Sequence, residues 1–190
     1  QNEMNENVGF QDQCAAACGG LVLIDADKEG VKPRRFICRK EYIEYIESSL
    51  LMGFDGSHRY SGIASKKITT AISQEKNAEY LNELHVLSQE GIKAFGMEES
   101  IEKNAEITKK CRDIKMRING DNENDHVMSL INETENAGSL CTRIMGAGGG
   151  GFFVCWAPKH MHERIKSRVK INTWVKIKFS SSGCQLIFSQ

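Results

Sequence analysis

A run of glycines near the C-terminal end is the feature that most constrains this chain. Residues 146–151 read Gly-Ala-Gly-Gly-Gly-Gly and hold five of the 17 glycines. Glycine adopts backbone conformations that other residues avoid, and it allows a backbone to approach another group closely. The flanking segments 142–145 and 152–156 have the composition of strands. The sequence therefore predicts a glycine loop between two strands. The loop alone leaves two readings open, a tightly packed bend and a contact with an anion or substrate.

Two common nucleotide-binding motifs do not explain this loop. Gly146, Gly148 and Gly151 satisfy the pattern G-x-G-x-x-G, but a dinucleotide fingerprint opens a helix and is followed about 20 residues later by an acid. Here a strand is predicted to follow, and Ile171 and Asn172 stand where the acid would be. The chain also has no Gly-Lys-Ser/Thr sequence, which a Walker-type loop requires.

The segments around the loop predict an α+β fold. The order after residue 141 is strand, glycine loop, strand, helix, strand, turn, strand, with the helix beginning near Pro158. The middle third repeats apolar residues at helical spacing, which predicts amphipathic helices from about Arg59 onward. We therefore expect a mostly antiparallel sheet covered by helices on one side. The predicted strands are residues 21–24, 35–39, 49–54, 142–145, 152–156, 175–179 and 186–188.

A second motif places an acid at the start of a helix. Residues 9–13 read Gly-Phe-Gln-Asp-Gln, and the Ala-rich segment 11–18 predicts a helix that ends at Gly19-Gly20. In one interpretation, Asp12 caps free N–H groups and favours the helix dipole. In the other, its carboxylate accepts a proton from a substrate hydroxyl.

Composition excludes several classes of protein. The 25 basic and 25 acidic residues give a formal net charge of zero, which argues against nucleic-acid binding by bulk charge, and the strands lack the aromatic pattern of an RNA-binding sheet. No run of about 18 apolar residues predicts a membrane span. The seven cysteines are odd in number and form no C-x-x-C pair, so we expect reduced thiols in the cytoplasm and no metal site.

The two motifs together resemble the galactokinase, homoserine kinase, mevalonate kinase and phosphomevalonate kinase (GHMP) superfamily. The resemblance lies in residues 9–20 and 143–152, and it is greatest to the D-glycero-D-manno-heptose 7-phosphate kinases. Residues 55–61 and 174–183 agree with it, so it covers nearly the whole chain. It implies the end of an ATP-binding N-terminal domain, followed by a GHMP C-terminal domain with a ferredoxin-like sheet and helices on one face. We assign residues 1–48 and 49–190 to these two parts.

The resemblance also implies a reaction and a site. These kinases transfer the γ-phosphate of ATP, with Mg²⁺, to a sugar hydroxyl, which in the heptose branch is the anomeric hydroxyl of a sugar 7-phosphate. Asp12 matches the catalytic aspartate, and Gln11, Gln13 and Arg59 match segments close to the substrate. The glycine loop matches the active-site floor near the transferred phosphate. A homodimer is compatible with the resemblance. The loop residues are Gly146, Ala147, Gly148, Gly149, Gly150 and Gly151.

Two departures from the family pattern limit what the chain can do alone. The chain lacks the Pro-x-x-x-Gly-Leu-Gly-Ser-Ser-like loop through which these kinases bind ATP, and Arg143 stands where many relatives have lysine. We therefore expect the C-terminal part of a kinase that is inactive in isolation. The alternative is a non-catalytic module for ligand binding or assembly built on the same half-fold.

Overall fold

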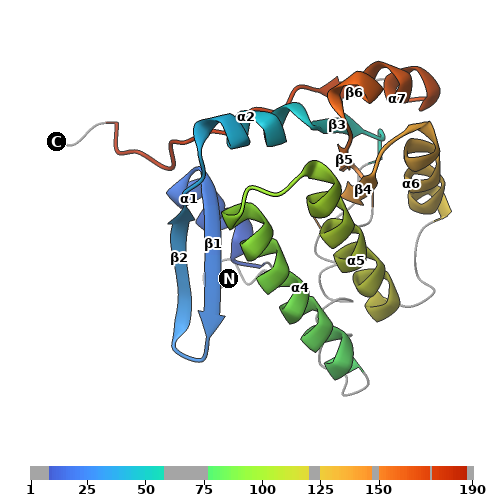
Figure 1. The fold of residues 1–190 in the computed structure, drawn as a ribbon. Coiled ribbons are helices and arrows are strands. Elements are labelled where there is room, and N and C mark those ends of the chain that lie inside the picture. Colours follow the sequence, from blue (N-terminus) through green and yellow to red (C-terminus); the bar gives the residue numbers. More distant parts are fainter. Residues whose placement is uncertain (1–8, 58–76, 120–124, 147–149, 172, 188–190) are drawn as a thin grey trace.

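The structure is a computed structural model that describes residues 9–57, 77–119, 125–146, 150–171 and 173–187. Figure 1 shows helices gathered around a small sheet, with a separate hairpin at one end. The predicted helices that fall within residues 58–76 lie outside the described residues. In chain order the elements are α1 (Gln11–Cys18), β1 (Leu21–Asp27), β2 (Gly30–Phe36), α2 (Lys40–Ser48), β3 (Leu50–Phe54), α4 (Ala78–Gly96), α5 (Ile101–Asn119), α6 (Asp125–Ala137), β4 (Cys141–Ile144), β5 (Phe152–Trp156), the 3₁₀ turn η2 (Lys159–Met161), α7 (His162–Arg168) and β6 (Thr173–Val175).

The central sheet has four strands in the order β4-β5-β3-β6, and every neighbouring pair is antiparallel. Gly53 in β3 stands opposite Phe153 in β5 on one side and opposite Trp174 in β6 on the other. The Trp174 and Phe153 rings meet edge to face, with centroids 5.7 Å apart. The α+β class and the antiparallel sheet predicted from the sequence are confirmed.

The main hydrophobic core lies between one face of the sheet and the helices α6 and α7. Strand residues alternate between faces, so Phe153 and Cys155 point into this core together with Leu51 of the neighbouring strand. Phe153, Cys155 and Ile165 of α7 are completely buried. Burying an aliphatic or aromatic side chain stabilises the fold by about 1.5–3 kcal/mol, so this layer is the principal source of stability.

The opposite face of the sheet is covered at one end. There α2 and the first turns of α5 pack on strand residues that include Cys141 and Trp156. Helices therefore lie on both sides of the sheet, and the prediction that they cover one side only is wrong: α6 and α7 cover one face, and α2 and α5 pack on the other. A third cluster joins α4 to α5 around Leu87, Ile114 and Ile118.

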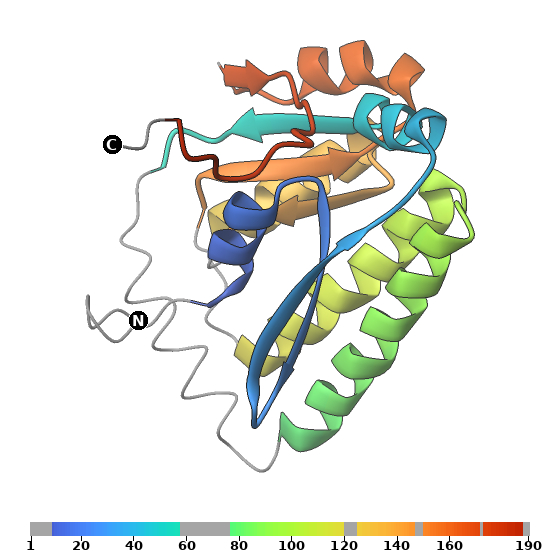
Figure 2. The same ribbon diagram turned by 90° about the vertical axis from the view of Figure 1, so that its left-hand side faces the viewer.

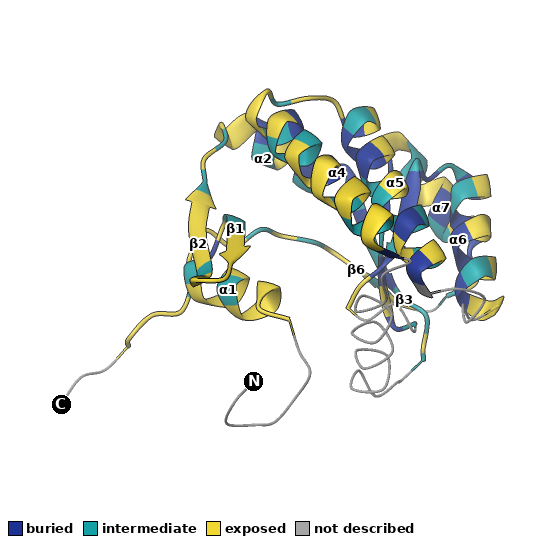
Figure 3. Cartoon of the chain, turned by 90° about the horizontal axis from the view of Figure 1, so that it is seen from below, coloured by how far each residue is buried: buried dark blue, intermediate teal, exposed yellow. Residues whose placement is uncertain are grey.

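The hairpin β1–β2 stands apart from these cores. Figure 3 shows it with α1 to the side of the helices, and most of its residues are exposed. The second strand was predicted at residues 35–39, but it runs from Gly30 to Phe36. The reason is a tight turn: the Asp27 carboxylate accepts the N–H groups of Glu29 and Gly30 at 2.8 and 3.1 Å, which starts the return strand at Gly30.

The predicted closing hairpin is wrong. The last strand ends at Val175 and pairs with β3, and residues 176–187 form no strand. The chain instead crosses to α2 and α1, where the Phe179 N–H donates to Glu47 and the Gly20 N–H donates to the Ser180 carbonyl. These polar bonds to distant elements replace the strand pairing that local alternation predicts. Residue 188 lies outside the described residues.

The C-terminal segment completes the end of α1. The last four carbonyls of a helix have no partner within it, and here all four are satisfied. The Gly19 N–H donates to Ala15, and the Cys184 N–H is shared between Ala16 and Ala17 at 3.0 and 3.2 Å. The Arg35 guanidinium donates twice to the Cys18 carbonyl, at 3.0 and 2.7 Å. The predicted helix 11–18 is confirmed, and it is held at its C-terminal end by residues from β2 and the C-terminal segment.

Gly183 makes this contact possible, and replacing it tests the attachment. A Cβ at this position would overlap the Ala17 carbonyl oxygen, and the adjacent atoms are backbone that cannot rotate away. We expect Gly183→Ala to lower the free energy of unfolding by about 1–3 kcal/mol, as overpacking does, and to speed amide exchange in α1. The control is Gly91→Ala in α4, which has open space around it and should be neutral or stabilising. Unchanged exchange in α1 would contradict this attachment.

Candidate functional site

The glycine loop joins two neighbouring strands, as predicted. It leaves β4 after Ile144 and enters β5 at Phe152. Gly146, Gly150 and Gly151 have φ angles of +70°, +118° and +98°, values that side chains other than glycine rarely adopt. Residues with side chains would be strained at these positions. Ala147, Gly148 and Gly149 lie outside the described residues.

A buried aspartate ties the end of this loop to the end of β3. The Asp55 side chain is completely buried, and its Oδ1 accepts the Gly151 N–H at 3.0 Å. In return, the Asp55 N–H donates to the Gly151 carbonyl at 3.0 Å. The same Oδ1 accepts the N–H and the hydroxyl of Ser57, at 2.7 and 2.6 Å. Asp55 therefore holds its own turn and the glycine loop together.

The second oxygen of this carboxylate has a different environment. Oδ2 is buried and has no hydrogen-bond partner among the described residues, although Nε2 of His126 lies 3.4 Å away and pairs with it when the imidazole is protonated. Burial by itself would raise the pKa of Asp55. Hydrogen bonds from Ser57 and Gly151, together with the nearby His126, outweigh it and leave the pKa below its ordinary value. The carboxylate is therefore charged at neutral pH.

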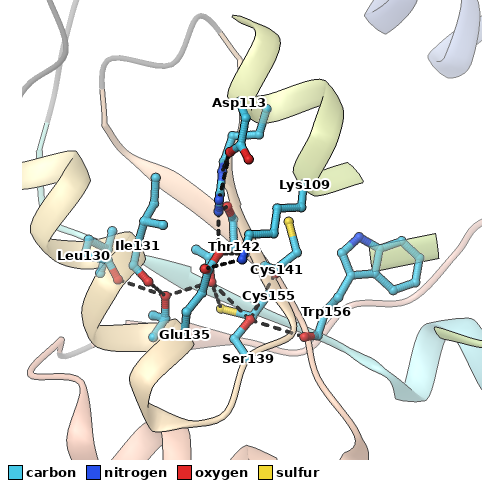
Figure 4. Close-up of polar contacts among 12 residues, drawn as sticks. Lys109, Asp113, Leu130, Ile131, Glu135, Ser139, Cys141, Thr142, Cys155 and Trp156 are labelled. Carbon is cyan, nitrogen blue, oxygen red and sulfur yellow. Dashed lines mark hydrogen bonds and ion pairs between the residues drawn. The ribbon is translucent and has the colours of Figure 1, made fainter. Parts of the chain in front are cut away.

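Strand β4, which leads into the loop, is anchored by a buried polar network (Figure 4). The Thr142 hydroxyl lies 2.7 Å from that of Thr134 in α6 and 3.1 Å from that of Ser139. It also contacts the Cys155 sulfur at 3.3 Å. Ser139 Oγ in turn donates to the Trp156 carbonyl. Buried polar groups that all find partners define one arrangement of the elements that carry them, so this network fixes α6 against β4 and β5.

An ion pair extends this anchoring to α5. The Arg112 guanidinium binds the Glu135 carboxylate of α6 and donates to the Thr142 carbonyl at 2.9 Å. Glu135 also accepts the Thr142 N–H at 3.1 Å, and Lys109 lies 3.4 Å from its other oxygen. Both charged groups are largely buried and hydrogen-bonded, so removing either would leave the other without its partner.

The buried thiols beside this network are not nucleophiles at neutral pH. Burial raises the pKa of Cys141 to about 12 and that of Cys155 to about 11. The thiolate is the reactive form, and at these values it is scarce. All seven cysteines are free in the structure.

The predicted catalytic residue stands away from the sheet. Asp12 lies in the first turn of α1 and is exposed, as are Gln11 and Gln13. No side chain caps this helix, so the capping interpretation of Asp12 is not observed. Figure 1 places α1 beside the β1–β2 hairpin and to the side of β4 and β5. The Asp12 side chain forms no hydrogen bond or ion pair with any described residue. Arg59 lies outside the described residues.

Sequence reasoning missed the clamp by which the Asp55 carboxylate binds both Ser57 and Gly151. The stretch 55–61 supported the family resemblance, but no role followed for Asp55, Ser57 or His126. The available signal was a polar Asp-Gly-Ser turn that directly follows an apolar strand, a position where ligand-contacting residues are common. Their proximity to the glycine loop depends on strand pairing and could not be read from local sequence.

Two other properties concern the described residues only. Within them, no group of three or more His, Cys, Asp or Glu side chains could hold a metal ion. None of their helices is both long enough and apolar enough to cross a membrane.

Comparison with solved structures identifies the fold. Similar structures include a D-glycero-D-manno-heptose 1-phosphate kinase from Bacteriodes thetaiotaomicron, with a TM-score of 0.60 and 18% identity over 96% of this chain and 50% of that one. L. major mevalonate kinase has a TM-score of 0.60 and 13% identity, over 78% of this chain and 44% of that one. Methanococcus jannaschii mevalonate kinase has a TM-score of 0.56 and 14% identity, over 72% of this chain and 40% of that one.

These likenesses show the fold: this chain folds like part of the mevalonate kinase and heptose 1-phosphate kinase structures. The chain spans half or less of the length of these three structures. No protein-family model matches the sequence, and no curated protein is significantly similar to it.

The clamp predicts a pH-dependent contribution to stability. We expect Asp55→Ala to lower the free energy of unfolding by about 1–3 kcal/mol at pH 7, because it leaves the Ser57 and Gly151 N–H groups without an acceptor. The folded-state pKa of Asp55 is lowered. Its contribution is therefore complete above the unfolded value of about 3.9 and is lost as the pH falls through the lower folded value.

Urea unfolding of wild type and Asp55→Ala between pH 7 and pH 2 measures this effect. The difference between the two proteins should narrow below about pH 4. The control is Asp25→Ala, which removes an exposed ion pair with Arg34 and should cost little. A difference that stays constant over the whole pH range would show that the charge of Asp55 does not support the loop.

Proposed function

We propose that this chain is the C-terminal part of an ATP-dependent kinase that phosphorylates a sugar, a heptose 7-phosphate, at its anomeric hydroxyl. The observation that carries the proposal is the glycine loop on a kinase-like half-fold, with its exit fixed by Asp55. Phosphoryl transfer depends chiefly on positioning and on stabilisation of charge. A loop of small residues held in one place suits both requirements.

The residues of this chain would contribute in two ways. Backbone N–H groups of the glycine loop other than that of Gly151, which donates to Asp55, would stabilise negative charge on the transferred phosphate, because consecutive backbone N–H groups can form anion-binding concavities. Asp12 would accept the proton of the attacking hydroxyl. Its carboxylate is exposed and has no partner among the described residues, so it is available for that role. Gln11, Gln13 and Arg59 would contact the sugar.

ATP and Mg²⁺ are part of the proposal through the family resemblance. Proteins usually hold Mg²⁺ with one or two carboxylates, together with substrate phosphates and water. The described residues form no cluster of three or more ligating side chains. They therefore do not make a metal site by themselves, and we assign the metal no step here. With free thiols throughout, we place the protein in the reducing cytoplasm.

The proposal is tested by binding and by activity. Calorimetry on the 190-residue chain should show binding of heptose 7-phosphate with little or no binding of ATP, because the ATP-binding loop is missing from the sequence. The same chain should release no ADP in the presence of both compounds. Binding of neither compound would favour the non-catalytic assembly module. ATP- and sugar-dependent ADP release by this chain would show that the missing loop is not required.

Asp12 is tested in the kinase-active full-length protein. Asp12→Asn keeps the size of the side chain but removes the base, so we expect turnover to fall by about 10²–10⁴-fold with little change in substrate affinity. Asp25→Asn is the matched control, because it neutralises an exposed aspartate in the nearby hairpin. Near-wild-type turnover of Asp12→Asn would remove Asp12 from the mechanism.

A further inference from the structure

Two neighbouring cations, Lys115 and Arg143, have no counterion among the residues that the structure describes. Lys115 belongs to α5, and Arg143 belongs to β4, three residues before Gly146. In the part of the chain that the structure describes, neither side chain forms a hydrogen bond or an ion pair. Other cations of α5 do have acidic partners: Lys110 pairs with Glu106 and Arg112 with Glu135. The absence of a partner is therefore not general to α5, although Arg117, an exposed residue near its end, also lacks one among the described residues.

Strand alternation and helix periodicity bring the two side chains together. Thr142 faces α6, so its neighbour Arg143 faces the opposite side of the sheet, where α5 packs. The guanidinium of Arg112 in α5 reaches the Thr142 carbonyl at 2.9 Å, which places this turn of α5 beside β4. Lys115 lies one turn further along α5, on the same face as Cys111. Both Cys111 and Lys115 interact electrostatically with Arg143.

The charges around Lys115 are unfavourable for a cation. Crowding by neighbouring protein atoms and the nearby Arg143 guanidinium lower the pKa of Lys115, and Cys111 opposes them only weakly, although the residue as a whole stays exposed. Glu90 of α4 acts on Cys111 and Lys110 but is not among the groups that act on Lys115. An anion placed between Lys115 and Arg143 would relieve their repulsion.

We propose that Lys115 and Arg143 together bind the phosphate monoester of a ligand beside the glycine loop. A guanidinium can hold two phosphate oxygens at once, and an ammonium group adds a mobile point charge. Because Arg143 lies three residues before Gly146, a phosphate bound to it would lie near the start of the glycine loop. The proposal deepens the proposed function, on which it rests for the choice of ligand. That phosphate belongs to the phosphorylated sugar or to the nucleotide.

The direct test uses inorganic phosphate as the probe on the 190-residue chain. Nuclear magnetic resonance of the Lys115 side chain follows its ionisation with and without phosphate. Phosphate should raise the pKa of Lys115, because the bound anion favours the charged ammonium group. In Arg143→Gln, the pKa should already be raised without phosphate, since the like charge is gone, and phosphate should have little further effect. If the pKa of Lys115 changes neither when phosphate is added nor in Arg143→Gln, the proposal is overturned.

Affinity gives a second readout. Calorimetry should show phosphate binding weakened at least tenfold in Lys115→Gln and in Arg143→Gln, which corresponds to about 1.4 kcal/mol. Arg164→Gln is the charge-matched control, because Arg164 is an exposed residue of α7, the helix that covers the other face of the sheet. If Arg143→Gln fails to fold, the exposed Lys115→Gln decides alone. Equal weakening in the control, or no weakening in either variant, would refute the site.

Competition separates the two phosphate sources and separates this proposal from the proposed function. Displacement of inorganic phosphate by heptose 7-phosphate would assign the pair to the sugar, and displacement by ATP would assign it to the nucleotide. Either result supports the phosphate site. If Lys115 and Arg143 bind phosphate but the full-length protein has no kinase activity, this site is supported and the proposed function is refuted. Kinase activity that is unchanged in both Lys115→Gln and Arg143→Gln would support the proposed function and refute this phosphate site.

Discussion

The antiparallel pairing of β3 with β5 is the constraint on which the rest of the structure depends. It joins residues 50–54 to residues 152–156, and closing so long a loop costs conformational entropy. Burial of Phe153 and Cys155 under α6 and α7 offsets that cost. Figure 2 shows these strands at the centre of the molecule, with helices packed around them. Glycine fits at position 53 of β3, opposite Phe153, because a Cβ there would overlap the side chains of Phe153 and Ile171. The polar turn after β3 and the glycine loop before β5 are neighbours only because the two strands pair.

This pairing turns a loop of small residues into a defined site. Asp55 reaches across to Gly151 over a sequence separation of 96 residues, and the hydrogen bonds that it accepts keep its buried carboxylate charged. On the other side of the loop, the hydroxyls of Thr134, Thr142 and Ser139 hold β4 against α6. The two ends of the loop are thus held by the strands and helices that flank it. Arg143 projects from the same strand on the opposite face, on the side where α5 and Lys115 lie, so one short strand carries both the structural anchor and the proposed phosphate contact.

Much of the local structure could be predicted from the sequence. The helix 11–18, the strand 152–156 and the glycine loop between strands all appear where composition and periodicity place them. The strand predicted at 35–39 was displaced because the Asp27 carboxylate sets the turn. The segment after Val175 has the alternation of a strand, yet its N–H groups bond to α1 and to Glu47. Alternation reports which residues can face a core, but it does not report which partner is within reach.

The sequence by itself determined the conformations that depend on near neighbours: helical runs, apolar strands, and the positions where only glycine is comfortable. It also determined the family resemblance that suggests a kinase, because motifs such as Gln-Asp-Gln and the glycine run are local. Only the tertiary structure decided that Asp55 binds the glycine loop, that the C-terminal segment completes α1, and that Lys115 and Arg143 act on each other electrostatically with no counterion among the described residues. Each of these contacts joins segments far apart in the chain. Its existence depends on the packing of whole elements, which no local pattern encodes.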